Sequence, residues 1–494
     1  MATIAKRDSM EATVVGLQTK LNSAQLSETK PKRRHLGIAD LPPSIRNNIY
    51  KYALDTELAN VGEANVSYKH TIKDGVLQFK ASRLPFRVQT SLFSVNKQIS
   101  HEALHYFYSK NLFVRFEIYS ADARHAKTML ENSGLLFSTA SSELLERSKR
   151  HALELVLVEK NSSQKRAAIM FPAQYLPRLI HFLDQASRTT TSWAPNHSLF
   201  INVMNTYDFP VSRLQGDLLE LFRLLSNLGG ATIDTANLLP RYAEGLQANM
   251  TAASFTADNW LQSVTDLANL ADSARDKEDY TTSIEYSQIV RIALTYGYLT
   301  HAETLHTQDE AFAKSIQRLR WRTELGLGIA LSLQHRAFTS ANKDWLTIAP
   351  PTPETVETAR ALLLAESSLS RALSLATDAP SPASNPWFLS LPVELIPPNK
   401  PTWFTEIERA QTWYALGTVH AQLGENLFAA GDMERALGLY GESKDKDEEA
   451  RERVEKAFER IRQQIDGDRE SMWKGTVRPG GALKRAGVVG RLEV

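Results

Sequence analysis

The sequence contains no cysteine among its 494 residues. That absence excludes disulfide frameworks, zinc sites built on thiolates and enzymes with a cysteine nucleophile, including ubiquitin ligases that carry ubiquitin on a cysteine. A surplus of charge of one sign is also absent, because 57 Lys and Arg residues face 56 Asp and Glu residues and the formal net charge is +1. The chain therefore has no general attraction for nucleic acid or for an anionic membrane.

Long apolar runs are missing as well. No stretch reaches the roughly 18 uninterrupted apolar residues that a membrane-spanning helix needs. Residues 1–18 lack the apolar segment of a secretory signal and carry Asp8 and Glu11. We therefore expect an intracellular protein that contacts no membrane. The basic run at residues 30–35 fits a nuclear-import signal and equally a solvated tail, so cytoplasm and nucleus both stay open.

Most motifs of catalytic sites are not found. The chain has no Gly-x-Gly-x-x-Gly after a strand pattern, no phosphate-binding loop and no Gly-x-Ser-x-Gly turn. These absences leave nucleotide-dependent and hydrolase chemistry without support. We expect no enzyme and no cofactor.

One motif does have a catalytic form. His101, Glu102 and His105 have the His-Glu-x-x-His spacing with which zinc peptidases place two imidazoles on one helix face beside a glutamate base. The apolar stripe of this helix is predicted to consist of Val95, Ile99, Ala103 and Tyr106. Both histidines point away from that stripe, toward solvent, and no third histidine follows at a peptidase spacing. A zinc peptidase is the remote alternative.

Length and composition indicate more than one domain. A chain of 494 residues is too long for one hydrophobic core, and its 43% hydrophobic and 23% charged content is that of a globular protein. Helix and strand patterns alternate over residues 36–235, and only helical patterns follow over residues 236–470. Residues 1–35 and 471–494 are expected to be a disordered arm and tail. The predicted fold is an α+β domain followed by an all-α domain.

The α+β half has several recognisable elements. Asp74-Gly75 is a favoured turn pair and predicts a β-hairpin over residues 66–79. A short amphipathic helix begins at Pro42-Pro43 and carries Ile45, Ile49, Tyr52 and Ala53 at helical spacing. The other predicted helices cover residues 92–110, 177–186 and 212–228, and the other predicted strands cover 112–118, 152–158 and 198–203. Gly229-Gly230 is expected to close this half.

Two blocks of this half resemble a known family. Residues 41–54, with Leu-Pro at the start, Ile-Tyr in the middle and Leu at the end, are followed by a second block over residues 92–113. The second block contains Val-Asn-x-Gln-Ile, Glu-Ala, Phe-Tyr and Asn-x-Phe in that order. Together they resemble the F-box-like segment common in filamentous fungi.

The resemblance implies a partner. The leading helix of an F-box presents apolar side chains to the Skp-type adaptor of a cullin-RING ubiquitin ligase. The matching side chains here are Leu41, Pro42, Ile45 and Ile49. The alternative is that these four residues pack on the chain's own hairpin and second helix, because an apolar helical stripe is usually core.

The helical half resembles tetratricopeptide repeats, which are helix pairs of about 34 residues. Residues 423–443 match the pattern if Gly424 and Ala436 lie at the close helix contact and Gly431 lies in the turn. Trp413 to His420 match the opening signature more literally, yet this spacing places them too early to pair with Ala436. Weaker units near residues 270–283 and 327–372 suggest about three repeats, with residues 448–464 as a capping helix.

Stacked repeats of this kind curve, and their concave face holds a peptide or a partner helix. The two resemblances together imply a protein-interaction scaffold in which the helical half binds a target and the F-box-like helix binds an adaptor. The alternative is a scaffold with no connection to ubiquitin.

Overall fold

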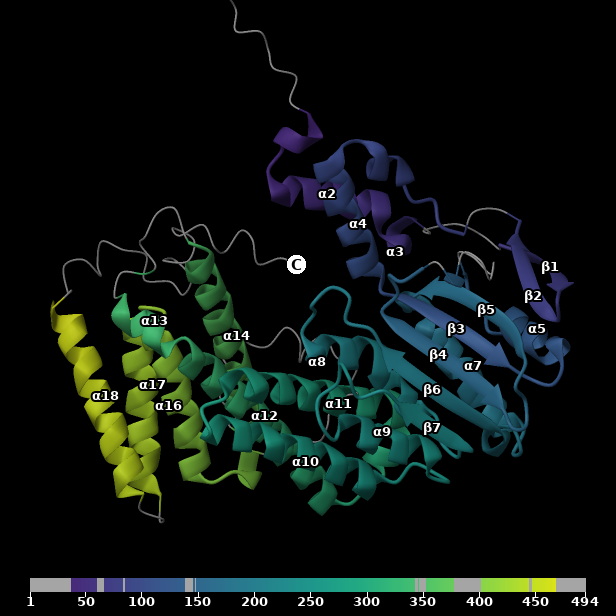
Figure 1. The fold of residues 1–494 in the computed structure, drawn as a ribbon. Coiled ribbons are helices and arrows are strands. Elements are labelled where there is room, and N and C mark those ends of the chain that lie inside the picture. The colour runs from purple at the N-terminus through teal and green to yellow at the C-terminus, as the bar shows by residue number, and fades with distance from the viewer. Residues whose placement is uncertain are drawn as a thin grey trace, which may run out of the picture. The chain divides into compact units, whose positions relative to one another are not determined.

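The computed structural model describes residues 37–59, 66–82, 85–137, 145–146, 148–342, 345, 352–376, 401–443 and 447–467 (Figure 1). The expected arm and tail, the basic run at residues 30–35 and the proline-rich segment 378–400 lie outside the described residues. The chain divides into two compact units, one formed by Met1–Leu58 with Val88–Phe107 and the other by Ala59–Arg87 with Tyr108–Val494.

The first unit is built on two helices from distant parts of the sequence. Helix α2 (Pro43–Leu54) begins with proline at its first position, where the missing N–H costs nothing. The short α3 (Thr56–Ala59) follows it, and a 3-10 turn η2 (Thr90–Ser94) precedes α4 (Lys97–Asn111). The Asn96 side chain accepts a hydrogen bond from the Ile99 N–H at 2.8 Å and thereby caps α4. This cap explains why the helix expected from residue 92 begins only at Lys97.

The core of this unit differs from the predicted one. Tyr50 and Leu54 of α2 pack against Ile99 and Ala103 of α4, and all four are buried. The predicted stripe of α2 is wrong in part, because Ile45 and Tyr52 are exposed and Ile49 and Ala53 are only half-buried. In α4, Val95 of the predicted stripe lies before the helix and is also exposed. The buried face of α2 is rotated toward Arg46, Tyr50 and Leu54, which follow one another at intervals of one turn.

The second unit opens with the predicted hairpin. Strands β1 (Tyr68–Lys73) and β2 (Val76–Ala81) pair antiparallel around Asp74 and Gly75. Both turn residues have positive φ, 52° and 77°, which is the requirement of the tight hairpin turn that Asp-Gly favours. The predicted hairpin is confirmed.

A mixed sheet follows, with strand order β5-β3-β4-β6-β7. The predicted strands appear as β3 (Phe113–Tyr119), β4 (Leu153–Glu159) and β6 (His197–Val203). Strand β3 is parallel to β4 and antiparallel to β5, while β6 is antiparallel to β4 and parallel to β7. The sequence therefore predicted the central strands and missed both edges.

The missed edge strands carry weak signals. Strand β5 (Lys165–Pro172) contains two adjacent alanines and ends in proline, both unfavourable in a strand interior and tolerated at an edge. Strand β7 (Gly230–Ile233) is short and begins with glycine, which made residues 229–230 look like the end of this half.

Helices complete this part of the unit. The predicted helix 177–186 is confirmed as α7 (Leu176–Thr189), and α5 (Ala123–Asn132) and α9 (Tyr242–Thr251) were not predicted. The helix expected over residues 212–228 is wrong as a single element. It divides into α8 (Val211–Leu214), a π-helical turn η5 (Gln215–Leu219) and a 3-10 turn η6 (Glu220–Leu224). Gly216 has low helix propensity, and an added Cβ there would lie 2.7 Å from Ile292 Cδ1.

From residue 257 the described chain forms helix pairs, as the sequence indicated. The pairs are α10 (Ala257–Asp276) with α11 (Tyr280–His306), α12 (Glu310–Gln334) with α14 (Pro353–Ala376), and α16 (Glu406–Gln422) with α17 (Asn426–Glu442). Short α13 (Arg336–Ala341) and η8 (Pro401–Trp403) lie between them, and α18 (Glu448–Gly467) ends the stack. The first helices of the pairs, α10, α12 and α16, also contact one another in succession (Figure 1).

The last helix pair corrects the register expected from the sequence. Gly431 lies inside α17, while Gly424, with φ of 73°, forms the turn between the helices. The close contact is at Gly417, where an added Cβ would lie 3.2 Å from the Ala429 carbonyl oxygen and 3.2 Å from Met433 Cγ. Residues 413–420, which match the opening signature of the repeat and were expected to lie too early, therefore do pack against α17. None of the described helices is both long enough and apolar enough to cross a membrane.

Candidate functional site

The first candidate surface is the outer face of α2. Ile45 is 46% exposed and Pro42 is exposed, while Leu41 and Ile49 are half-buried. Tyr52, on the same side of the helix, is 75% exposed. The four residues predicted as adaptor contacts thus lie outside the buried stripe of α2, and they leave an apolar patch on its surface.

A charged contact fixes this helix. Arg46 donates from Nε and Nη2 to the two carboxylate oxygens of Glu102, each at 2.8 Å, and the Tyr50 hydroxyl donates to the same carboxylate at 2.9 Å. Arg46 also donates to the carbonyl oxygen of Leu41, which holds the start of α2. A two-pronged guanidinium–carboxylate pair is among the strongest and most directional side-chain contacts. It orients the outer face of α2 relative to α4.

The same contact bears on the zinc motif. His101 and His105 are exposed, as the sequence predicted, whereas Glu102 is bonded to Arg46 and Tyr50. A carboxylate engaged in this way is not available as a general base beside a metal. Among the residues that the structure describes, no three His, Asp or Glu side chains come together in a group that could hold a metal ion.

The Glu102 contact predicts an acid dependence of the first unit. The hydrogen bonds from Arg46 lower the pKa of Glu102 to about 2, against an ordinary value of 4.5. A lowered pKa stabilises the folded state above pH 4.5, and this stabilisation is lost as the pH falls from 4.5 toward 2. We expect the protection of α2 amides in hydrogen exchange, corrected for intrinsic rates, to fall over that range. Glu102→Gln should weaken protection at neutral pH and remove most of the dependence.

Glu57→Gln, a change at an exposed side chain of α3, is the matched control and should behave as wild type. An unchanged acid dependence in Glu102→Gln would contradict the assignment.

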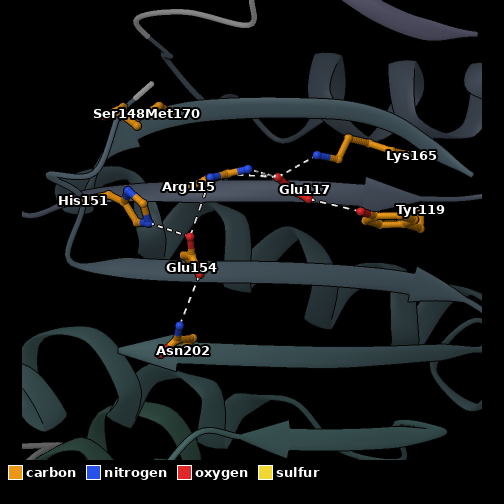
Figure 2. A network of polar contacts seen from close by, with 9 residues as sticks. All are labelled: Arg115, Glu117, Tyr119, Ser148, His151, Glu154, Lys165, Met170 and Asn202. Atoms are coloured by element: carbon orange, nitrogen blue, oxygen red, sulfur yellow. Dashed lines mark hydrogen bonds and ion pairs between the residues drawn. The ribbon is translucent and has the colours of Figure 1, made fainter. Parts of the chain in front are cut away.

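The second candidate is a polar network on one face of the sheet. Figure 2 shows its side chains on the near face of the strands, with helices behind. Glu117 of β3 accepts from Arg115 Nε at 3.0 Å and from Lys165 Nζ at 2.9 Å, and Tyr119 donates to its other oxygen at 3.4 Å. Burial favours the neutral acid, but the two cations outweigh burial and lower the pKa of Glu117. Glu117 therefore stays ionised, which does not suit a group that exchanges protons near neutral pH.

A second part of this network surrounds Glu154 of β4. Its carboxylate lies 2.7 Å from His151 Nε2, accepts from Asn202 Nδ2 at 3.2 Å and lies 3.7 Å from Arg115 Nη1. A shallow hollow of about 350 Å³ beside it is lined by Glu154, Val156, Phe200, Ile201, Asn202, Thr232 and Asp234. The contacts connect β3, β4 and β6 across the sheet.

Serine, histidine and glutamate stand three residues apart here, at Ser148, His151 and Glu154. A catalytic triad requires the serine hydroxyl to hydrogen-bond the imidazole. Instead, Ser148 Oγ contacts Met170 Sδ at 3.9 Å, and His151 Nδ1 is buried without a hydrogen-bond partner among the described residues (Figure 2). The three groups do not form a triad, and the network serves to bind strands together.

The third candidate is a groove in the helical stack. It has a volume of about 920 Å³, at the upper end of the range for ligand cavities. Helix α16 contributes Gln411, Tyr414 and Thr418 to the lining of the groove. Helices α12 and α13 also line it, and α18 contributes residues between Ala457 and Gln464. The first helices of successive pairs thus line the groove together. We call it the α16 groove.

Comparisons with known proteins give no further guide. No family model, no curated protein and no solved structure matches this chain at a significant level. The F-box-like and repeat-like resemblances therefore depend on the motif residues quoted above.

The contacts that organise these surfaces were not predicted from the sequence. Arg46 lies on the same face of α2 as Tyr50 and Leu54, one helical turn before Tyr50. A cation on a face that is otherwise buried needs a partner carboxylate, and this position was the available signal in the sequence. The repeat-like pattern predicted a concave binding face but not the residues that line the α16 groove, because these come from helices that are far apart along the chain.

Proposed function

We propose that the chain is a non-catalytic protein-interaction scaffold in which α2 binds the Skp-type adaptor of a cullin-RING ubiquitin ligase and the helical stack binds a target. The observation that carries the proposal is the exposed apolar face of α2, with Ile45 at 46% exposure. An exposed apolar patch on a fixed helix suits a partner with an apolar groove. Ubiquitin transfer would belong to other subunits.

The helical stack supports the second half of the proposal. Trp413, Leu416 and Gly417, followed by Ala429 and Met433, have the spacing of a tetratricopeptide repeat. Gly417 occupies the close helix contact, as the glycine of that pattern would. The described residues form three helix pairs and a terminal helix, which reach the number that a stable stack needs. In such stacks the first helices of the pairs line the binding face. The proposal is supported by the α16 groove, because α12 and α16, the first helices of two successive pairs, both line it.

A scaffold without a ubiquitin connection is the alternative. This alternative is supported by the contact of Arg46 with Glu102. Glu102 belongs to the Glu-Ala pair of the second motif block, and the contact gives that pair a structural role within the first unit, without any adaptor. On this alternative the helical stack alone binds the partner.

The two proposals are separated by a pull-down of the full chain with purified Skp-type adaptor. The double substitution Ile45→Asp and Ile49→Asp places two charges in the proposed contact and should reduce retention by about tenfold or more, as expected for central interface residues. Ile72→Asp, at a 60% exposed isoleucine of the hairpin, is the matched control and should bind as wild type.

Circular dichroism of each variant checks that it remains folded. Failure of the wild-type chain to bind the adaptor would refute the ubiquitin proposal and leave the alternative.

A further inference from the structure

We infer that the α16 groove binds an acidic peptide segment with apolar side chains. The inference rests on the proposed scaffold function and specifies its target. The residues that line the groove include two arginines, Arg336 of α13 and Arg460 of α18, and no aspartate or glutamate. Both arginines are exposed, and neither forms an ion pair with another residue in the described part of the chain. The groove is therefore positive, although the chain as a whole is close to neutral.

The neutral polar side chains of the groove suit a peptide backbone. The carboxamides of Gln411, Asn426 and Gln464 line it without a hydrogen bond to any other described residue. A carboxamide both donates and accepts, so it matches the C=O and N–H of an extended peptide. Gln422, by contrast, is already engaged, since it accepts from Ser332 Oγ at 2.9 Å and donates to the Ser332 carbonyl oxygen at 3.1 Å.

The apolar part of the lining supplies sites for side chains. The apolar residues include Ile329 and Leu333 of α12, Trp345, Tyr414 of α16 and Ile461 of α18. Trp345 is buried and donates from Nε1 to the Gln422 carbonyl oxygen at 3.2 Å, which holds its ring at the groove. A volume of about 920 Å³ accommodates several side chains of a peptide.

Charge distinguishes a partner from the chain's own tail. Residues 468–494 carry six Lys and Arg against three Asp and Glu, so the tail has the same sign of charge as the groove. A second copy of a chain with net charge +1 offers no surplus of negative charge either. An acidic segment of another protein is the occupant that pairs Arg336 and Arg460.

The test is a selection of a random dodecapeptide display library on the full chain, in parallel with the Arg336→Gln/Arg460→Gln variant. Wild type should enrich peptides in which Asp and Glu flank apolar residues, and the variant should not. A fluorescein-labelled synthetic peptide of the enriched sequence should bind the variant at least about tenfold more weakly, as the loss of charge-assisted hydrogen bonds implies. Binding should weaken with added salt.

Arg451→Gln is the matched control, because Arg451 is an exposed arginine of α18 that does not line the groove. Neutral or basic peptides, no enrichment, or equal loss in the control would each overturn the inference. Binding that appears only after residues 468–494 are removed would assign the groove to the tail. Binding that weakens as the chain self-associates would assign it to a second copy.

Adaptor retention separates this inference from the proposed function. The Arg336→Gln/Arg460→Gln variant should retain the Skp-type adaptor as wild type does, and the Ile45→Asp/Ile49→Asp variant should bind the selected peptide as wild type does. Loss of both activities in one variant would indicate misfolding, which circular dichroism detects.

Discussion

Replacement of Glu220 by alanine is expected to lower the free energy of unfolding by about 3–5 kcal/mol, the range for removing one partner of a buried ion pair. Glu220 and Arg223 of η6 are 1% and 2% exposed, and Arg223 Nε donates to Glu220 Oε2 at 2.8 Å. The Tyr242 hydroxyl of α9 donates to the other oxygen at 2.8 Å. Without Glu220, a guanidinium and a hydroxyl would stay buried with no acceptor at this place.

The pKa values agree with this interpretation. Burial disfavours the charged form of Arg223, but Glu220 outweighs burial and raises the pKa of Arg223 above its ordinary value. Burial and the Glu220 carboxylate together raise the pKa of Tyr242 well above its ordinary value. The carboxylate is therefore the group on which both partners depend.

Urea denaturation of three variants measures the effect. Tyr242→Phe removes only one hydrogen bond and should cost about 1 kcal/mol. Asp217→Ala removes the exposed partner of Arg213, in a pair one helical turn apart at 3.4 Å, and should change stability by less than about 1 kcal/mol. If Glu220→Ala were no more destabilising than Asp217→Ala, the buried pair would not have the proposed role.

Replacement of His420 by alanine is expected to destabilise the helical stack by about 3 kcal/mol at pH 6. His420 of α16 is buried, with Nδ1 at 2.7 Å from Asp432 of α17 and Nε2 at 3.6 Å from Glu366 of α14. Its removal leaves the nearly buried Asp432 carboxylate with a single ion pair among the described residues, to Arg435 at 3.6 Å. One imidazolium thus connects the last two helix pairs.

The same residue predicts a dependence on alkaline pH. Burial opposes the imidazolium, but the hydrogen bond that His420 donates to Asp432 and the negative charge of Glu366 outweigh burial and raise the pKa of His420 to about 9. A pKa raised from 6.5 stabilises the folded state fully below pH 6.5, and the stabilisation is lost as the pH rises from 6.5 through 9. Wild type should therefore become less stable to urea over that range.

The His420→Ala chain should show a flatter profile between pH 6.5 and 9, and His101→Ala, at an exposed histidine, should follow wild type. A profile for His420→Ala as steep as that of wild type would assign the alkaline loss to other groups.

The agreement between sequence and structure is best where the signal is local. The Asp74-Gly75 turn, the proline at the start of α2 and the alternating pattern of β3 each depend on neighbouring residues, and each was predicted at nearly its observed place. The helical character of residues 257–467 also follows from a repeated local period.

Disagreement appears where distant residues decide the outcome. Glu102 lies 56 residues from Arg46, and the carboxylate is what allows a cation in the buried stripe of α2. The contact of Gly417 with α17 was misplaced, because a glycine that allows close helix approach and a glycine that forms a turn look alike in a sequence.

By itself, the sequence determined the hairpin, the central strands of the sheet, the change to helical segments and the absence of cysteine chemistry, since these depend on composition and short-range periodicity. Only the tertiary structure decided which face of α2 is buried, which strands are neighbours in the sheet and which side chains line the α16 groove. The physical reason is that burial and ion pairing depend on residues that are brought together only when the chain folds, whereas turns and helix starts depend on the backbone preferences of adjacent residues.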